Sequence, residues 1–433
     1  MKNAATRGHP RALAEIEAMI LGGAPHAVLL SGPGSIGKTT LAMDLAAGLL
    51  CVDPSPAERP CRACRGCRQV ASGNHLDLHR LAPTGPGGQI KIGDAINPDQ
   101  GTARHLISEL SLLPAEGGAR VAIIEQAHRA NDDAQNALLK LLEEPPAGVT
   151  IILCADDEEC LLTTVRSRCA RVRLSAVGSR EIEDWLGELG VADAPQASRL
   201  ARLADGRPGL ALGYARSTDA ERIRGEIARG ILDMLTARRG ARLAAIREMM
   251  KSAAALDAAL AEARRDTSAT TSGTGASGRT TTGRGRKGKA AAGGTADAAI
   301  DEAEAVAEAG ATNDEPVAAK LAASERRTAA ATLMEIWAAV ARDLAVVKAG
   351  GARQLHEIGL VDEFRAIAPA VSTGSITGFL TQLATIDRQL DDNVNPELAL
   401  DVLTLNWPNV EVAVAAPAGV GGGGGSGRPA GPR

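Results

Sequence analysis

The chain has 433 residues and a formal net charge of −4 at pH 7. This length predicts two or three domains. The chain has no overall positive charge that would indicate nucleic acid as its direct ligand. With three Trp, one Tyr and two Phe residues, the core must consist of Ala, Leu, Val and Ile. The shortage of aromatic rings also disfavours a platform on which bases stack.

The sequence favours a cytoplasmic protein without a membrane partner. No apolar run reaches the roughly 20 residues that a membrane-spanning helix needs, and the segment from Met1 to Pro10 lacks the apolar stretch of a signal peptide. Four of the seven cysteines are clustered, which indicates metal ligation in a reducing compartment rather than a secreted disulfide framework.

Strand and helix patterns alternate between residues 10 and 175. The apolar runs that read as buried strands are Ala27–Leu30, Val121–Ile124, Val149–Cys154 and Ala170–Leu174. Helical patterns separate these runs, so the sequence predicts an α/β fold with a parallel sheet.

The best-signalled helix follows the second of these strands. Asn131 is placed to cap it, and Pro145 with Pro146 stops it. Its predicted apolar stripe is made of Ala134, Ala137, Leu138, Leu141 and Leu142.

Beyond residue 176 the pattern becomes helical without strands. It is interrupted at 266–318, where Ser, Thr and Gly give way to an acidic, Ala-rich stretch. We predict a disordered insertion there, because this composition buries too little apolar surface to offset the entropy of ordering. Its basic residues fit a solvated linker better than a nucleic-acid contact. The Gly-rich tail at 411–433 is also predicted to be disordered.

Residues 32–39, Gly-Pro-Gly-Ser-Ile-Gly-Lys-Thr, form a phosphate-binding loop motif between an apolar strand and a helical pattern. The glycines let backbone amides face phosphate oxygens at a helix N-terminus. Lys38 is then expected to reach the β- and γ-phosphates of ATP or ADP, and Thr39 to ligate Mg²⁺. A turn that fits the motif by chance is the weaker alternative, and the motif alone does not predict hydrolysis.

Hydrolysis requires a carboxylate that holds magnesium and a base that activates water. Here the strand at 121–124 ends in Glu125 and Gln126. Glu125 is long enough to reach the metal, but the amide of Gln126 is not a base. A glutamine still orients water in some GTPases, so we expect a weak or inactive ATPase.

The clustered cysteines have the spacing C-x9-C-x2-C-x2-C and are Cys51, Cys61, Cys64 and Cys67. Four thiolates from tight turns suit a closed tetrahedral zinc site, which would be structural because no position is left open. Disulfides or free thiols are the alternatives. The scattered Cys154, Cys160 and Cys169 are interpreted as small buried hydrophobic residues.

Two further segments complete a family resemblance. These are residues 136–146, Asn-Ala-Leu-Leu-Lys-Leu-Leu-Glu-Glu-Pro-Pro, and Ser167-Arg168-Cys169. Together with the phosphate loop and the cysteine cluster, they resemble the bacterial clamp loader family, the gamma/tau and delta-prime subunits of DNA polymerase III. The resemblance covers residues 7 to 215.

The resemblance implies an AAA+ domain at 1–175 with a zinc module at 51–67, an all-α lid at 176–220, and an all-α collar at 221–265 and 319–410. It implies that Arg168 acts in trans on the ATP of a neighbouring subunit, and a surface ion pair is the alternative for this residue. The expected nucleotide-binding residues are Gly32, Gly34, Gly37, Lys38, Thr39, Thr40, Glu125 and Arg207.

Three positions favour the delta-prime type over gamma/tau. ATPase subunits carry Asp-Glu where this chain has Glu125-Gln126, and a threonine-rich sensor where it has Ala155-Asp156. The segment 206–211 is also more similar to delta-prime. The expected partners are gamma/tau and delta subunits in a five-subunit ring, the sliding clamp and primed DNA. The alternatives are an active gamma/tau-type ATPase and a different AAA+ protein of DNA repair or remodelling.

Overall fold

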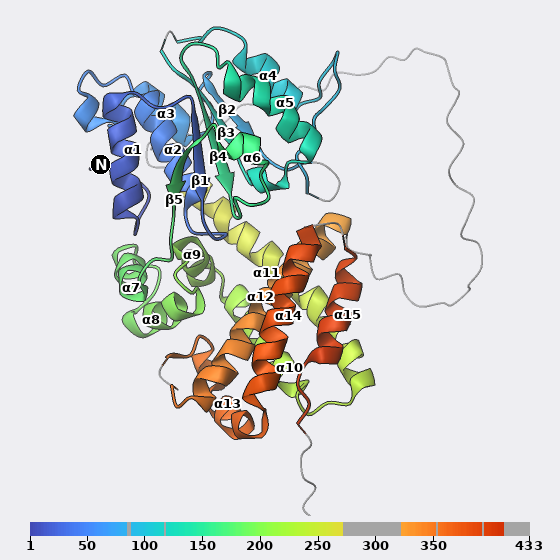
Figure 1. Cartoon of the computed structure of the whole chain (residues 1–433). Coiled ribbons are helices and arrows are strands. Elements are labelled where there is room, and N and C mark those ends of the chain that lie inside the picture. Colours follow the sequence, from blue (N-terminus) through green and yellow to red (C-terminus); the bar gives the residue numbers. More distant parts are fainter. Residues whose placement is uncertain (85–87, 117, 272–321, 352–353, 392–393, 411–433) are drawn as a thin grey trace, which may run out of the picture.

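The computed structural model describes residues 1–84, 88–116, 118–271, 322–351, 354–391 and 394–410 (Figure 1). The predicted tail at 411–433 and most of the predicted insertion lie outside these residues. Residues 266–271 are the exception, because they continue a helix that ends at Thr271. No helix in the described ranges is both long and apolar enough to cross a membrane.

The first part of the chain is built on a five-stranded sheet with the order β2-β3-β4-β1-β5. Its strands are β1 (Ala27–Ser31), β2 (Leu78–Leu81), β3 (Arg120–Ile124), β4 (Val149–Ala155) and β5 (Ala170–Arg173). Every neighbouring pair is parallel, which confirms the predicted parallel sheet.

The sequence did not predict strand β2. Only its first and last residues, Leu78 and Leu81, are buried, while His79 is half-buried and Arg80 is exposed. The strand lies at the edge of the sheet and pairs with β3 alone. Four residues with two polar side chains give neither a long apolar run nor a clear alternation, so the pattern carries little signal.

Helices cover both faces of the sheet (Figure 1). They are α1 (Pro10–Gly22), α2 (Lys38–Leu49), α3 (Arg65–Ala71), α4 (Ala103–Leu110), α5 (Asp132–Glu143) and α6 (Thr163–Arg166). Alternate residues of β1 serve the two cores: Val28 and Leu30 pack with α1 and α2, and Ala27 and Leu29 pack with α4 and α5. Both faces are therefore buried, as expected for a parallel sheet.

Helix α5 begins and ends as predicted. The Asn131 side chain accepts a hydrogen bond from the Ala134 amide at 2.9 Å, and the helix ends at Glu143. One detail of the predicted apolar stripe was wrong: Ala137 is half-buried, whereas the polar Gln135 is buried on that face.

The rest of the described chain is helical. Its helices are α7 (Ser179–Glu188), α8 (Ala194–Leu203), α9 (Pro208–Arg216), α10 (Thr218–Asp233), α11 (Arg239–Thr271), α12 (Ala323–Lys348), α13 (Val361–Ile367), α14 (Thr373–Asp391) and α15 (Pro396–Asn406). One hydrophobic cluster extends through these helices. The division into a lid at 176–220 and a collar beyond it remains a prediction.

Arg242, near the start of α11, binds the backbone at Trp407 and Pro408 and so holds this segment against α11. It is 2% exposed. Its guanidinium donates hydrogen bonds to the carbonyls of Trp407 at 2.7 Å and Pro408 at 3.0 Å, and to Leu235 at 3.2 Å. A guanidinium suits this place because its donors form a rigid fork.

Replacing Arg242 by Ala is expected to destabilise the protein by about 3 kcal/mol, because buried carbonyls lose their donors. Urea unfolding followed by circular dichroism measures this change. Arg239→Ala is the matched control, since Arg239 is exposed in the first turn of the same helix. Equal losses for the two variants would contradict the role assigned to Arg242.

Candidate nucleotide pocket and metal site

The phosphate loop connects the end of β1 to the start of α2. Gly32 has a φ of 148°, and a Cβ there would lie 2.3 Å from the Leu174 carbonyl oxygen. Gly37 has a φ of 112° and precedes the first residue of α2. Both positions require glycine, so the loop takes the tight turn that the motif predicts.

A pocket of about 500 Å³ opens over this loop. The predicted residues that line it are Gly34, Gly37, Lys38, Thr39, Thr40 and Glu125. Gln126, Cys154, Asp156, Gly209 and Arg264 also line it. The pocket therefore combines the loop, the ends of β3 and β4, and residues from α9 and α11.

Lys38 is the most buried charge of the pocket, with 7% of its side chain exposed. Its ammonium group donates to the carbonyls of Gly32 at 2.5 Å and Pro33 at 2.6 Å. It also forms an ion pair with the Asp156 carboxylate at 2.8 Å. Asp156 directly follows β4, and its neighbour Ala155 accepts a hydrogen bond from the Gly32 amide at 3.3 Å.

Glu125 lies at the end of β3, as predicted, but it is paired. Arg80 of the edge strand β2 donates to its carboxylate through Nε at 2.9 Å and also through Nη2. The next residue, Gln126, has a left-handed φ of 48° at the turn that leaves the strand.

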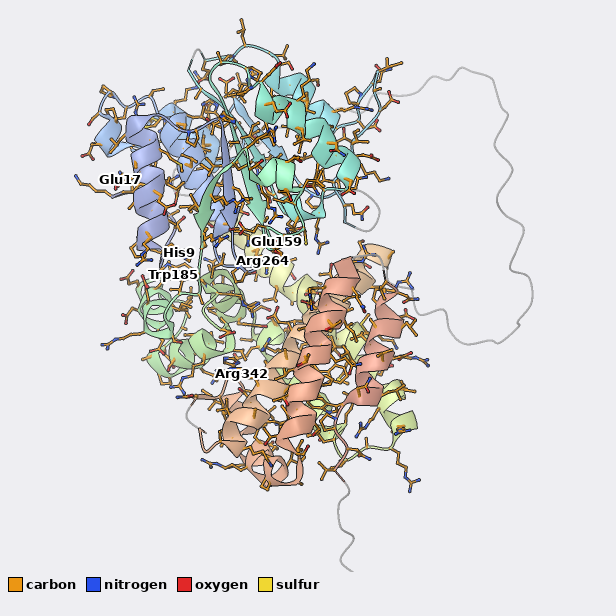
Figure 2. All side chains as sticks on the ribbon, viewed as in Figure 1. His9, Glu17, Glu159, Trp185, Arg264 and Arg342 are labelled. Carbon is orange, nitrogen blue, oxygen red and sulfur yellow. The ribbon has the colours of Figure 1, made fainter. Side chains whose placement is uncertain are left out.

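The structure does not bring Arg207 to the pocket. Its guanidinium forms an ion pair with Glu335 of α12 and donates to the Ala204 carbonyl at 3.1 Å. The basic residue that does reach the pocket is Arg264, near the end of α11, where the sheet part meets the helical part (Figure 2).

Ser35 is the point at which later helices contact the phosphate loop. Its hydroxyl accepts a hydrogen bond from Arg264 at 3.1 Å, and its carbonyl accepts one from the Gly209 amide at 3.1 Å. A Cβ at Gly209 would lie 2.8 Å from that carbonyl oxygen. Helices α9 and α11 therefore rest directly on the loop.

Arg168 lies in the short segment between α6 and β5, away from the lining of the Lys38 pocket. It forms an ion pair with Glu143, the last residue of α5, at 2.7 Å. It also donates to the Thr164 carbonyl at 2.9 Å. About a third of its side chain is exposed, at 35%, so its guanidinium is fixed at the surface.

The four clustered cysteines meet at one point. The sulfurs of Cys51, Cys61, Cys64 and Cys67 all lie within 4.8 Å of one another, and the group could hold a metal ion. Within it, the Cys61 sulfur accepts from the Cys64 amide, and the Cys64 sulfur accepts from the Cys67 amide, each at 3.3 Å.

Electrostatics in this cluster depend on burial and on these amides. Burial raises the pKa of the Cys51 and Cys67 thiols. Burial also opposes ionisation of Cys64, but hydrogen bonds from the backbone amides of Cys67 and Val52 outweigh it and lower the pKa of that thiol to about 6. A cation at the centre would favour the thiolate at all four.

The remaining cysteines fit their prediction only in part. Cys154 is buried, and burial raises the pKa of its thiol to about 12. Cys160 and Cys169 are half-buried instead. Cys169 nevertheless packs against the core on the α5 face of the sheet.

Gln135 is a buried polar residue of α5 whose structural role the sequence did not reveal. It is 3% exposed, and its amide nitrogen donates to the carbonyls of Ala130 at 2.9 Å and Cys160 at 3.3 Å. Its oxygen accepts from the Leu162 amide at 2.7 Å. One side chain therefore ties α5 to the loop that leads to α6 and Arg168.

Replacing Gln135 by Leu is expected to destabilise the protein by about 2 kcal/mol, because the Leu162 amide and the carbonyls lose buried partners. Thermal unfolding measures the loss. Asn136→Leu, at the exposed neighbouring position, is the control. Unchanged stability of the Gln135→Leu protein would refute this role.

Comparison with known proteins relates the first part of the chain to DNA polymerase III. The family described as DNA polymerase III, delta subunit, matches residues 9–178. The tau subunit of Salmonella typhimurium is 36% identical over 191 residues, which are 43% of this chain and 28% of that protein. The delta-prime subunit of Pseudomonas aeruginosa is 35% identical over 185 residues, or 42% of this chain and 53% of that protein.

The chain thus spans about half the length of the delta-prime relative and less of tau. The match to the structure of a gamma subunit-related protein from Thermotoga maritima covers 91% of this chain and 97% of that chain, at 14% identity and a TM-score of 0.38. The resemblance indicated by the motifs is confirmed where the sequences align. Residues 9–178 match the family described as DNA polymerase III, delta subunit, and the chain is similar to the delta-prime and tau subunits of DNA polymerase III.

Proposed function

We propose that this chain is a cytoplasmic, delta-prime-type subunit of the DNA polymerase III clamp loader, which helps place the sliding clamp on primed DNA during replication. The match over residues 9–178 supports the family. One contrast supports the delta-prime type over the gamma/tau type. Arg168 lies at the surface, held by Glu143 and the Thr164 carbonyl, while the chain's own pocket lacks a base for hydrolysis. Such a subunit assists its neighbours' chemistry more than it performs its own.

The pocket over the phosphate loop is proposed to bind ATP or ADP. The loop amides and Lys38 would hold the phosphates, and Thr39 with Glu125 would hold a magnesium ion, which supplies charge neutralisation between phosphate oxygens. The lining of the pocket by Gly34, Gly37 and Thr40 fits this role. Arg207 is not among the proposed phosphate ligands, because it does not line the pocket and is paired with Glu335.

Hydrolysis in this pocket is proposed to be slow for two reasons. Glu125 is held by Arg80, so it must give up an ion pair to serve as a metal ligand. Gln126 supplies an amide where a base is needed, and an amide does not accept a proton at neutral pH.

Arg168 is proposed to act in trans as an arginine finger. A guanidinium beside a γ-phosphate stabilises the charge that develops during its transfer. Glu143 and the Thr164 carbonyl position the Arg168 side chain at the surface, and the guanidinium would exchange the Glu143 ion pair for the phosphate of the neighbouring subunit. The proposed partners are the gamma/tau and delta subunits, in a five-subunit ring.

An active gamma/tau-type ATPase remains the second candidate. Two observations favour it: the phosphate loop is intact, and the identity to tau, 36%, is one percentage point higher than the identity to delta-prime, 35%. The two candidates differ in which residue the complex needs most, Lys38 or Arg168.

The cysteine cluster is proposed to hold a structural zinc ion. Zinc–sulfur bonds of about 2.3 Å in a tetrahedron place the sulfurs roughly 3.8 Å apart, and the Cys51 and Cys64 sulfurs are 3.8 Å apart. All four ligands come from the protein, so the ion would have no open position for substrate.

We expect Arg168→Ala to lower DNA-dependent ATP turnover of the reconstituted complex by about 1,000-fold or more at the affected site, since an arginine finger contributes on that scale. Lys38→Ala should have a mild effect on the complex. Steady-state phosphate release, with primed DNA and the clamp present, measures both.

Arg180→Ala is the control for these assays, because Arg180 is exposed at the start of α7. The isolated chain, without partner subunits, should release almost no phosphate from ATP. Substantial turnover by the isolated chain that Lys38→Ala abolishes would replace the delta-prime assignment with the motor subunit.

Purified protein is expected to carry about one zinc ion per chain. Cys61→Ser and Cys64→Ser should lose it and unfold at lower temperature, because metal-binding energy is also folding energy. Elemental analysis with thermal unfolding tests this, with Cys160→Ser as the control outside the cluster. Full zinc content in Cys61→Ser would contradict the proposed site.

A further inference from the structure

The carboxylate of Asp156 occupies the mouth of the phosphate loop. Its Oδ1 is 2.8 Å from the Lys38 ammonium nitrogen, and its Oδ2 is 3.3 Å from the position that a Cβ on Gly34 would take. Asp156 therefore lies against both the loop backbone and the lysine that the loop presents. Its side chain is 41% exposed, so it faces the open side of the pocket.

The backbone keeps this carboxylate in place. The Asp156 amide donates to His128 Nδ1 at 3.1 Å, and Ala155 before it is fully buried and accepts from the Gly32 amide. Aspartate has a short side chain, so its charge stays close to the loop. The His128 Nε2 atom lies 4.0 Å from Oδ2.

The charges that line the pocket already balance one another. Lys38 and Arg264 are the cations, and Glu125 and Asp156 the anions, among the described residues that line it. Lys38 is the buried member of this set, so it is the charge on which a bound phosphate depends most. Asp156 already neutralises it.

The Asp156 carboxylate is expected to weaken binding of the γ-phosphate more than binding of the β-phosphate. Loop amides and Lys38 together hold the β-phosphate, whereas a γ-phosphate depends mainly on Lys38 and lies nearer the open side of the pocket. The γ-phosphate oxygens would have to approach Lys38 where the Asp156 carboxylate lies. Two negative groups within a few ångströms repel each other strongly in a partly desolvated site, and displacing the carboxylate breaks its ion pair.

We propose that Asp156 makes this pocket selective for nucleoside diphosphates over triphosphates. The inference rests on the proposed nucleotide binding and specifies the ligand of that pocket. With this selectivity, the chain would keep ADP bound and would not alternate between ATP-bound and ADP-bound states. The selectivity comes from one side chain at the end of β4.

Calorimetric titration of the purified chain with ADP and with a non-hydrolysable ATP analogue, each with Mg²⁺, tests this. The unmodified chain is expected to bind ADP about tenfold more tightly than the analogue. Asp156→Asn should tighten analogue binding about tenfold and change ADP binding by less than about threefold. Asp156→Thr should have the same direction of effect.

Asp157→Asn is the matched control, because it removes an equal charge from the neighbouring residue. Asp157 is exposed and accepts a hydrogen bond from the Glu159 amide at 2.8 Å. It should leave the preference unchanged. Equal effects of the two Asn variants, or a preference of the unmodified chain for the analogue, would overturn the inference.

The nucleotide titration and the Arg168→Ala assay test different claims. If neither nucleotide binds the chain or its Asp156→Asn variant, both nucleotide binding and the selectivity are refuted. The loss of turnover expected from Arg168→Ala is measured at a neighbouring subunit's ATP, so it stands or fails whichever nucleotide this chain prefers.

Discussion

The parallel pairing of β1 with β4 is the constraint on which the pocket depends. Ser31, the last residue of β1, lies opposite Ala155, the last residue of β4. Each strand continues into a functional segment: β1 into the phosphate loop and β4 into Asp156. Because the two strands end at the same level, the lysine of one segment meets the carboxylate of the other. The hydrogen bond from Gly32 to Ala155 extends the pairing into the loop.

Burial of both faces of β1 makes this pairing stable. Apolar side chains of β1 alternate between the core formed with α1 and α2 and the core formed with α4 and α5. A shift in register would exchange these faces and misplace every residue at the strand ends. The precision of the pocket is therefore a consequence of ordinary hydrophobic packing some distance from it.

Local signals in the sequence were enough to predict the sheet, α5 and the cysteine cluster. Long apolar runs, an Asn cap and close cysteine spacing are read within a few residues. The edge strand β2 was missed because two of its four residues are polar. Gln135 was missed because a polar residue within an apolar stripe gives no sign in the sequence of the backbone groups that it will bind. Arg264 lies far along the chain from the loop that it contacts, so no local pattern could reveal it.

The candidate site differs from its prediction mainly in how charges are paired. Sequence motifs identify which residues carry charge, but not which neighbours neutralise them. Glu125 is paired with Arg80, and Arg207 with Glu335. Each partner belongs to an element that the motif does not include. Ion pairing of this kind is a tertiary property, and it decides whether a charged residue is free for a ligand.

The contacts of Ser35 bear on how the protein is divided for experiments. The match to the family model ends at residue 178, whereas Gly209 and Arg264, which bind Ser35, lie beyond that point. A fragment truncated at residue 178 would keep each glycine of the phosphate loop and lose both of these supports. Its loop would be less restrained than in the whole chain. The segment that matches the family model is therefore shorter than the part of the chain that shapes the pocket.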